Sequence, residues 1–291
     1  MAEVRLAAVM AAYNRKHLTV ECLRSLESQK PPGVKLDVFV LDDASTDGTA
    51  DAIRDEFPDV VVLQGDGQHY WNGGMRRAFG AAIEGDYDYY LWMNDDTALE
   101  DGALQLLLEV EHELRGRDEA PAIVAGTTRH PDTGALTYGG HVRPSRWRPL
   151  HWQLVHPGDE PREVETMNGN AALVPRSVVR RVGNFDPNYV QQMGDFDYGL
   201  RARRAGCSVW IAPGTVGTCA SHPDRRTDVA PFMQEWSRMW SVKEQPFRPW
   251  AVFNRRWAGP LWPLSWSVSY LRRGVLLARE RVALRMSPTS R

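Results

Sequence analysis

Carboxylates gather at three places in the sequence where they could bind a metal ion or accept a proton. They are the segments 42–49 (DDASTDGT), 94–97 (NDDT) and 194–206 (GDFDYGLRARRAG). Clustered carboxylate oxygens are the ligands that Mg²⁺ and Mn²⁺ prefer. Asp195 begins a predicted helix, and an ionised carboxylate is stabilised there and can act as a general base. Each segment alone has a second interpretation, a polar turn that caps the next helix.

The segments around these clusters predict alternating strands and helices. Apolar runs predict the strands, and apolar residues at helical spacing, with polar first turns, predict the helices. The predicted strands are Val4–Ala12, Leu36–Leu41, Val60–Leu63 and Tyr87–Met93, and the predicted helices are His17–Gln29, Thr49–Phe57, Arg76–Glu84 and Gly102–Arg115. Between them, 64–74 reads as a loop rich in glycine and polar residues.

This alternation indicates an α/β fold with a mostly parallel sheet. The polar residues collect at the carboxyl ends of the strands, where ligands bind in open α/β sheets. After Pro121 the pattern changes to short β segments that continue to about Val174. A helix is predicted at Asp195–Ala205 and a further strand at Val209–Ala212.

Composition excludes several classes of protein. The chain has 291 residues, of which 43% are hydrophobic and 25% charged, which is typical of a globular protein rather than a disordered one. A net charge of −2 argues against binding nucleic acid through bulk positive charge. The three cysteines form no C-x-x-C pair, which favours a reducing compartment. The uncharged stretch in the tryptophan-rich tail, 257–271, is shorter than the roughly 20 residues of a membrane span.

The C-terminal tail differs from the rest of the chain. Residues 243–291 contain 10 basic residues and 2 acidic ones, and six of the 11 tryptophans lie between Trp236 and Trp266. Basic residues beside tryptophans suit peripheral contact with an anionic membrane. The alternative is a helix pair in which tryptophans are buried anchors, in a core or in a homodimer.

The order of AYNR (12–15), DDASTDGT, NDDT and GDFDYGLRARRAG resembles the family 2 glycosyltransferases, which have the GT-A fold. The resemblance covers about Val4 to His222. It implies a GT-A domain at 1–222, with a nucleotide-binding half at 1–118 and an acceptor-binding half at 119–222. Residues 223–291 would then be a basic, tryptophan-rich helical extension.

The resemblance also implies a role for individual residues. Asp195 matches the catalytic base, and Asp96 and His222 match ligands of Mg²⁺ or Mn²⁺. Tyr13 would lie beside the nucleobase, and Asp43 would accept a hydrogen bond from it. The other residues expected to bind the donor are Ala11, Ala12, Asn14, Arg15, Trp71, Gly73, Gly74, Asn94 and Asp95.

Some matched positions carry an alternative or a departure. Arg201 and Arg203 match basic positions after the base, one of which could be structural. His69 and Trp71 either shape the sugar pocket or pack the loop. The chain has Asn94 at the first position of the family's D-x-D motif, and Gly194 where many members have glutamate.

The implied activity is an inverting transfer from a nucleoside-diphosphate sugar, such as dTDP-rhamnose or a UDP-hexose, to a glycan or lipid-linked acceptor. It would serve bacterial surface-polysaccharide synthesis in the cytoplasm, at the inner face of the membrane. A sugar-phosphate nucleotidyltransferase is a rival hypothesis. It would carry a glycine-rich phosphate loop after the first strand, where this chain has Ala12–Arg15. A non-catalytic nucleotide-sugar-binding protein is the second rival.

Overall fold

A computed structural model describes residues 3–117, 120–220, 240–242 and 246–286, with side chains described as far as 275 except at 273. The chain divides into two compact units. The first contains residues 1–144 and 152–222, and the second contains 145–151 and 223–291.

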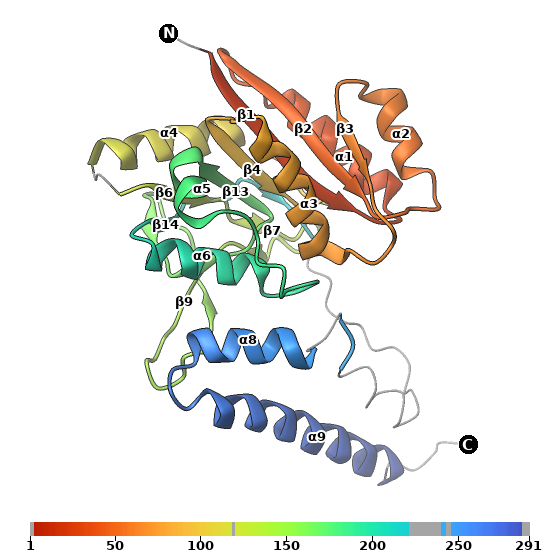
Figure 1. The fold of residues 1–291 in the computed structure, drawn as a ribbon, viewed down its shortest axis with the longest axis vertical. Coiled ribbons are helices and arrows are strands. Elements are labelled where there is room, and N and C mark those ends of the chain that lie inside the picture. Colours follow the sequence, from red (N-terminus) through yellow and green to blue (C-terminus); the bar gives the residue numbers. More distant parts are fainter. Residues whose placement is uncertain (1–2, 118–119, 221–239, 243–245, 287–291) are drawn as a thin grey trace. The chain divides into compact units, whose positions relative to one another are not determined.

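The first unit is built on an eight-stranded sheet in the order β11-β14-β6-β13-β4-β1-β2-β3 (Figure 1). Neighbouring strands from β4 to β3 pair in parallel, whereas β13 is antiparallel to both of its neighbours. The predicted mixed, mostly parallel α/β sheet is therefore confirmed. The strands are β1 (Val4–Ala12), β2 (Val34–Asp42), β3 (Val61–Gln64), β4 (Tyr89–Met93), β6 (Ala122–Ala125), β11 (Arg162–Glu163), β13 (Ala171–Pro175) and β14 (Ser208–Ile211).

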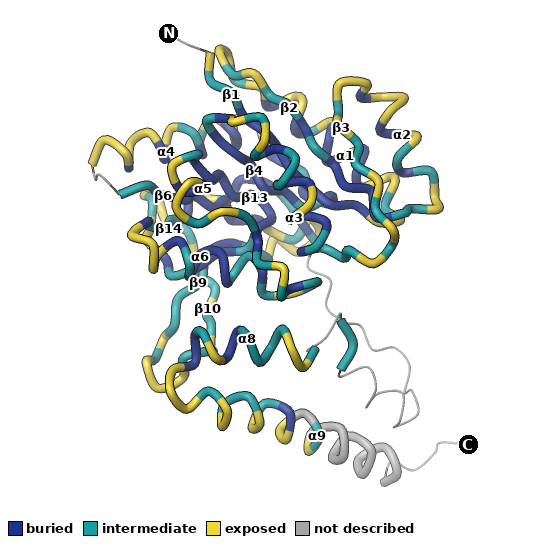
Figure 2. The backbone as a smooth tube through the Cα atoms, in the orientation of Figure 1, coloured by how far each residue is buried: buried dark blue, intermediate teal, exposed yellow. Residues whose placement is uncertain are grey.

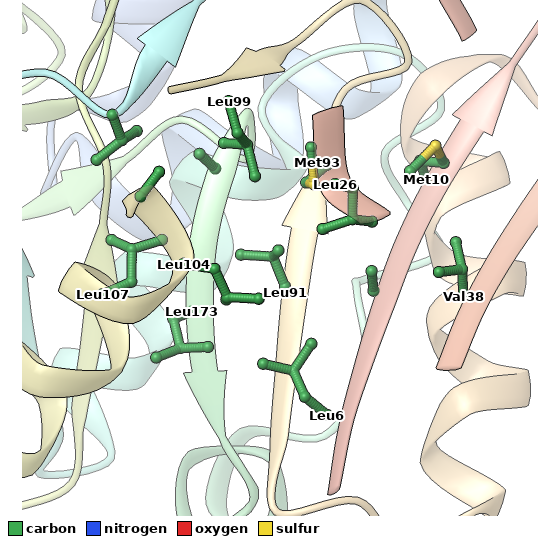
Figure 3. Packing of buried hydrophobic residues seen from close by; sticks show 14 of the residues in the cluster. Leu6, Met10, Leu26, Val38, Leu91, Met93, Leu99, Leu104, Leu107 and Leu173 are labelled. Atoms are coloured by element: carbon green, nitrogen blue, oxygen red, sulfur yellow. The ribbon is translucent and has the colours of Figure 1, made fainter. Parts of the chain in front are cut away.

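Helices cover both faces of this sheet, which explains why its central strands read as continuous apolar runs. In β1, Leu6, Ala8 and Met10 belong to the core on one face, and Ala7 and Val9 belong to the core on the other. Figure 3 shows the first of these cores, where leucines of α1 and α4 meet β1 and β4. That face carries α1 (Lys16–Ser28), α2 (Thr49–Glu56) and α4 (Ala103–Arg117), and the opposite face carries α3 (Tyr70–Glu84), α5 (Arg176–Val182) and α6 (Gly194–Arg204).

Two small sheets complete the first unit and flank the edge where β1, β2 and β4 end. One is four-stranded, with β5 (Ala98–Leu99), β15 (Gly217–Thr218), β7 (Thr128–Arg129) and β8 (Leu136–Tyr138). The other is three-stranded, with β10 (Gln153–Leu154), β9 (Gly140–Val142) and β12 (Thr166–Met167). They fill the region where the sequence predicts short β segments.

Helix α3 begins at Tyr70, six residues before the predicted start. Gly73 and Gly74 favour a loop by their helix propensity, but here they lie in the first turns of the helix. A Cβ at Gly74 would lie 2.7 Å from Cβ of Ala11 and 3.0 Å from Cδ2 of Leu41. The glycine therefore lets α3 approach the sheet closely, and packing overrides propensity.

The second unit contains α8 (Phe247–Trp257) and α9 (Trp262–Met286). Their aromatic side chains pack together: Phe247 stacks on Trp240 and on Tyr270, with ring centroids 4.2 and 4.7 Å apart. Within the described residues, neither these helices nor any other combines the length and hydropathy needed to cross a bilayer.

Candidate active site

The polar segments that follow β1, β2 and β4 meet at one edge of the sheet. These strands are neighbours, and Ala12 at the end of β1 pairs with Asp42 at the end of β2. The predicted residues 13–15, 43 and 94–96 come directly after them. This edge is where an α/β sheet binds ligands.

Arg15 and the two acids of the NDDT segment form an ion-pair cluster. Nη1 of Arg15 lies 2.8 Å from Oδ2 of Asp96 and 3.3 Å from Oδ1 of Asp95. Burial raises the pKa of the Asp95 carboxyl to about 7, an increase that Arg15 opposes and that the neighbouring charge of Asp96 reinforces. One guanidinium nitrogen therefore lies within ion-pair distance of two largely buried acidic side chains, and its single positive charge compensates them only in part.

A cysteine and an asparagine that the sequence does not single out support Asp96. The Cys219 thiol donates to Oδ1 of Asp96 at 3.2 Å, and Nδ2 of Asn170 donates to the Cys219 sulfur at 3.3 Å. Burial, with the charge of Asp96, raises the pKa of Cys219 to about 12, so the thiol remains a donor. Cys22, Cys207 and Cys219 are all buried free thiols.

Asp43 orders the loop between β3 and α3. Its Oδ1 accepts the backbone N–H of Gly67 at 2.9 Å, and its Oδ2 accepts those of His69 and Tyr70 at 2.9 and 3.0 Å. The carboxylate is 4% exposed. It fixes the start of α3, and thereby the position of Trp71.

Trp71 connects the NDDT segment with the predicted base. Its indole Nε1 donates to Oδ1 of Asn94 at 2.7 Å. A Cβ added at Gly169 would lie 3.0 Å from the Cζ2 and Cη2 atoms of Trp71 and 3.7 Å from Cβ of Asp195. Gly169 thus leaves room for the indole, and Trp71 lies between Asn94 and Asp195.

Asp195 lies in the first turn of α6 and is only partly exposed. Its Oδ2 accepts the backbone N–H of Gly169 at 3.1 Å, and its Oδ1 accepts that of Phe196 at 2.8 Å. Burial raises the pKa of the carboxyl to about 6, although these hydrogen bonds favour the charged form. The group can therefore exchange a proton near neutral pH.

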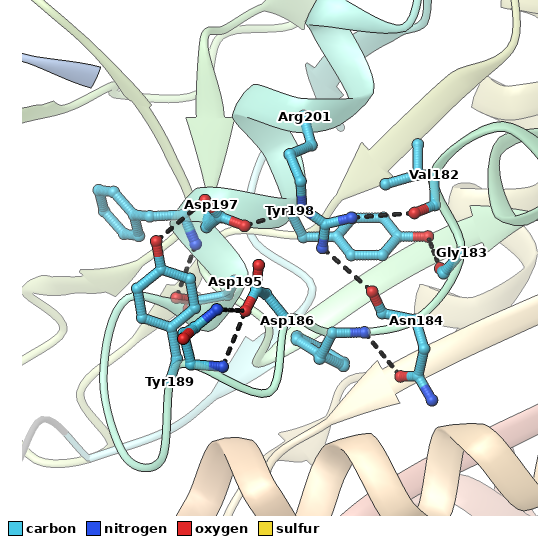
Figure 4. Close-up of polar contacts among 12 residues, drawn as sticks. Val182, Gly183, Asn184, Asp186, Tyr189, Asp195, Asp197, Tyr198 and Arg201 are labelled. Atoms are coloured by element: carbon cyan, nitrogen blue, oxygen red, sulfur yellow. Dashed lines mark hydrogen bonds and ion pairs between the residues drawn. The ribbon is translucent and has the colours of Figure 1, made fainter. Parts of the chain in front are cut away.

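Arg201, which matches a basic position of the family, has a structural environment (Figure 4). Its Nε lies 2.8 Å from Oδ2 of the fully buried Asp197, and its Nη atoms donate to the carbonyls of Val182 and Asn184. It ties α6 to the loop that follows α5. Arg203 instead forms surface ion pairs with Glu163 and Glu165.

The remaining predicted donor-binding residues separate into exposed and buried groups. Tyr13 is 52% exposed at the sheet edge. Asn14 braces the DDASTDGT loop, because its backbone N–H donates to Oγ of Ser45 and its Oδ1 accepts the backbone N–H of Thr46. Ala11 and Gly74 lie in the packing between β1 and α3, whereas Ala12 is buried in the core on the opposite face of the sheet. Gly73 donates its backbone N–H to the carbonyl of Val190.

The residues present suit a divalent cation at Asp95 and Asp96. Both carboxylates converge on one cationic atom, Nη1 of Arg15, so they can share a positive charge. A second group of ligand atoms, from Asp43, Asp66 and His69, lies within 4.8 Å of one another. In this second group, however, ligand atoms already have partners within the protein. The Asp43 carboxylate accepts three backbone N–H groups, and Nε2 of His69 lies 2.6 Å from a guanidinium nitrogen of Arg77. The predicted ligand His222 lies outside the described residues.

Comparisons with known proteins show which family the chain belongs to. The sequence matches the model of Glycosyl transferase family 2 over residues 7–183, more than half of the chain. It is 26% identical over 217 residues to N-acetylglucosaminyl-diphospho-decaprenol L-rhamnosyltransferase of Mycobacterium tuberculosis, covering 66% of this chain and 68% of that protein. It is 24% identical over 273 residues to Glycosyltransferase AglE of Haloferax volcanii, covering 89% of this chain and 79% of that protein.

Solved structures share the fold at low sequence identity. The mannosyltransferase PcManGT of Pyrobaculum calidifontis, in complex with GDP-Man and Mn²⁺, gives a TM-score of 0.56 at 18% identity, over 99% of this chain and 76% of that one. GalNAc-T7 with UDP, GalNAc and Mn²⁺ gives a TM-score of 0.60 at 11% identity, over 86% of this chain and 51% of that one. S. aureus TarS 1-349 gives a TM-score of 0.54 at 13% identity, over 75% of this chain and 60% of that one. The chain thus spans less than two thirds of the length of GalNAc-T7 and of TarS 1-349. These matches confirm the expected GT-A fold.

Proposed function

Because the chain belongs to glycosyl transferase family 2, we propose that it is an inverting enzyme that transfers a sugar from a nucleoside-diphosphate sugar to an acceptor hydroxyl. The observation that carries the proposal is how these groups are brought together. Arg15 forms an ion pair with Asp96, Trp71 donates to Asn94 of the same NDDT segment, and Gly169 adjoins both the Trp71 indole and Asp195. A cation-binding group and a proton acceptor therefore share one sheet edge.

Asp195 is the general base in this proposal. The acceptor oxygen attacks the anomeric carbon from the side opposite the nucleoside diphosphate. The bond from that carbon to the phosphate oxygen breaks, and the hydroxyl proton passes to the Asp195 carboxylate. A pKa of about 6 leaves the group ionised at neutral pH while keeping it basic enough to accept the proton.

Trp71 and Arg15 have positioning roles. The indole bounds the space between Asn94 and Asp195, so it would hold the sugar against the base and exclude water. Arg15 forms ion pairs with Asp95 and Asp96 and can turn its remaining N–H donors toward the diphosphate. Asp95 and Asp96, with Asn94 and His222, would hold Mg²⁺ or Mn²⁺. That ion, when bound, neutralises charge on the departing nucleoside diphosphate.

We propose dTDP-rhamnose as the donor, with a UDP-hexose as the alternative, and a lipid-linked glycan as the acceptor. Support comes from the mycobacterial relative, whose name specifies rhamnosyl transfer to a decaprenol-linked sugar. The exposed Tyr13 ring would stack on the nucleobase, and Oδ1 of Asp43 retains a lone pair for a base N–H. Donor and acceptor would meet in the cytoplasm, at the inner face of the membrane, for surface-polysaccharide synthesis.

Thermal unfolding in the presence of candidate donors tests this proposal. The protein would be heated with Mn²⁺ and dTDP-rhamnose, UDP-glucose, UDP-N-acetylglucosamine or GDP-mannose, each at the same concentration. A bound donor stabilises the fold by mass action, by about 2.7 kcal/mol at 100 times its Kd. We expect the largest rise in Tm with dTDP-rhamnose. No rise with any nucleotide sugar would contradict the proposal.

The rival functions give different products in an assay of turnover. A nucleotidyltransferase would convert a sugar phosphate and a nucleoside triphosphate to pyrophosphate and a nucleotide sugar. A binding protein would be stabilised by the donor without turning it over. Release of nucleoside diphosphate only when an acceptor is present separates the transferase from both.

A further inference from the structure

Helix α9 presents an apolar stripe to solvent. Its members are Leu264, Val268, Leu271 and Val275, which are between 48% and 68% exposed, and Leu261, which is 70% exposed, directly precedes the helix. The four helical residues recur at intervals of three and four, so they share one helix face over about 17 Å of helix length. Figure 2 shows the run of exposed positions along this part of the helix. Isolated exposed leucines are ordinary, but a continuous apolar stripe marks an interaction surface.

The charged residues of the segment that carries the stripe are all positive. No aspartate or glutamate occurs between residues 245 and 279, whereas Arg248, Arg255 and Arg272 are exposed. By helical geometry, Arg272 follows Leu271 and borders the stripe. The segment therefore combines an apolar face with cationic neighbours and no carboxylate that could neutralise them.

The second unit contains another feature of the same kind. Residues 145–151 belong to it, and within them Trp147 is 88% exposed and lies between the exposed Arg146 and Arg148. Tryptophan next to arginine is typical of groups that lie at the headgroup level of a bilayer. This tryptophan is distant in sequence from α9, so it is an independent observation.

We propose that the α9 stripe docks on an anionic lipid bilayer, with the helix lying in the plane of the interface and Trp147 as an additional anchor. Aliphatic side chains would enter the acyl boundary while the arginines contact lipid phosphates. The helix lies on the membrane and does not span it, in agreement with its hydropathy.

Charge selects the lipid surface over a second copy of the chain. A dimer through this stripe would bring the arginines of two copies together, with no acidic residue of segment 245–279 to pair with them. An anionic bilayer supplies the opposite charge for every arginine. The tail tryptophans, in contrast, pack within the unit: Trp250 donates its indole N–H to Oγ of Ser269, and Trp257 is 9% exposed.

Vesicle flotation of the full-length protein tests the proposal. The vesicles would contain phosphatidylcholine alone or phosphatidylcholine with 40 mol% phosphatidylglycerol, a chosen composition of roughly the anionic content that gives a marked surface potential. The variant Leu264→Gln/Leu271→Gln removes the centre of the stripe. The control Leu18→Gln changes a leucine that is 39% exposed on α1, in the first unit. Size exclusion at several protein concentrations would be run on every variant.

We expect wild type and Leu18→Gln to float with the anionic vesicles only. The stripe variant should lose about tenfold or more of that partitioning, because apolar burial in the interface is lost. Arg272→Gln should weaken binding and reduce its salt dependence. Absence of wild-type flotation, or equal flotation of wild type and the stripe variant, would overturn the proposal. So would a concentration-dependent dimer that only the stripe variant abolishes, which would assign the stripe to a second copy.

Discussion

The indole N–H of Trp71 and the side-chain oxygen of Asn94 are joined by a 2.7 Å hydrogen bond that links two segments of the sheet edge. The bond places an aromatic ring between the carboxylates of the NDDT segment and Asp195. Asn94, at the first position of the D-x-D motif, is the uncharged acceptor of this bond. Asn94 thus aligns the ring without adding a third charge beside Asp95 and Asp96.

Trp71→Phe removes this hydrogen bond and keeps an aromatic ring. A typical hydrogen bond contributes about 0.5–1.5 kcal/mol, so we expect kcat/KM for the donor to fall by about two- to tenfold. The matched control is Trp210→Phe, which removes a 2.9 Å bond from an indole N–H to Oγ of Ser208 on β14. Steady-state kinetics should show the loss in the first variant alone, and equal losses in both would assign the effect to general stability.

Gly169→Ala should displace Trp71. The added Cβ would lie 3.0 Å from two carbon atoms of the indole, closer than ordinary van der Waals contact. We expect about a tenfold loss of kcat/KM with a destabilisation of about 1–3 kcal/mol from overpacking. Gly158→Ala is the control, because a Cβ there meets nothing within 4 Å. Unchanged kinetics in Gly169→Ala would show that the ring's position is not important for transfer.

Asp195→Asn should stabilise the fold above pH 6. Burial raises the pKa of this carboxyl to about 6 from an ordinary value of 3.8. The native state therefore binds the proton more tightly than the unfolded state, and stability falls as the pH rises through this window. Asparagine cannot ionise, so it avoids a cost of about 3 kcal/mol at pH 7. Urea unfolding at pH 4 and pH 7.5 measures this: the variant's advantage should be present at pH 7.5 and small at pH 4. An advantage that does not change with pH would contradict the assigned pKa.

Arg201→Met should destabilise the protein more than Arg203→Met. Removal of Arg201 deletes the ion pair that it forms with the fully buried carboxylate of Asp197, at an expected cost of about 3 kcal/mol. Arg203 pairs with glutamates at the surface, where such pairs contribute less than about 1 kcal/mol. Denaturant midpoints of the two variants test the difference. A larger loss in Arg203→Met would reverse the structural assignment.

The sequence predicts the elements whose apolar pattern is strong. β1 was identifiable because it is buried on both faces, and the sheet edge followed from the polar residues after β1, β2 and β4. The start of α3 was not identifiable, since Gly73 and Gly74 favour a loop and only the close approach of Ala11 explains a helix there.

The support around the carboxylates has no local signal at all. Cys219 lies 123 residues after Asp96, and nothing in its neighbourhood in the sequence indicates a contact with the NDDT segment. The same holds for Gly169, whose importance depends on the indole of Trp71 folding against it. Such partners are set by tertiary packing, which a pattern in one segment does not contain.

The central claim is that Asp195 accepts the acceptor's proton while the donor is held at the same sheet edge. Its most direct test measures release of nucleoside diphosphate from dTDP-rhamnose by wild type and Asp195→Asn, with Mn²⁺ and a lipid-linked N-acetylglucosamine acceptor, alongside donor affinity by calorimetry. The account predicts acceptor-dependent release by wild type, loss of at least about a hundredfold in the variant, and equal donor affinity in both. Release by Asp195→Asn at the wild-type rate would contradict it.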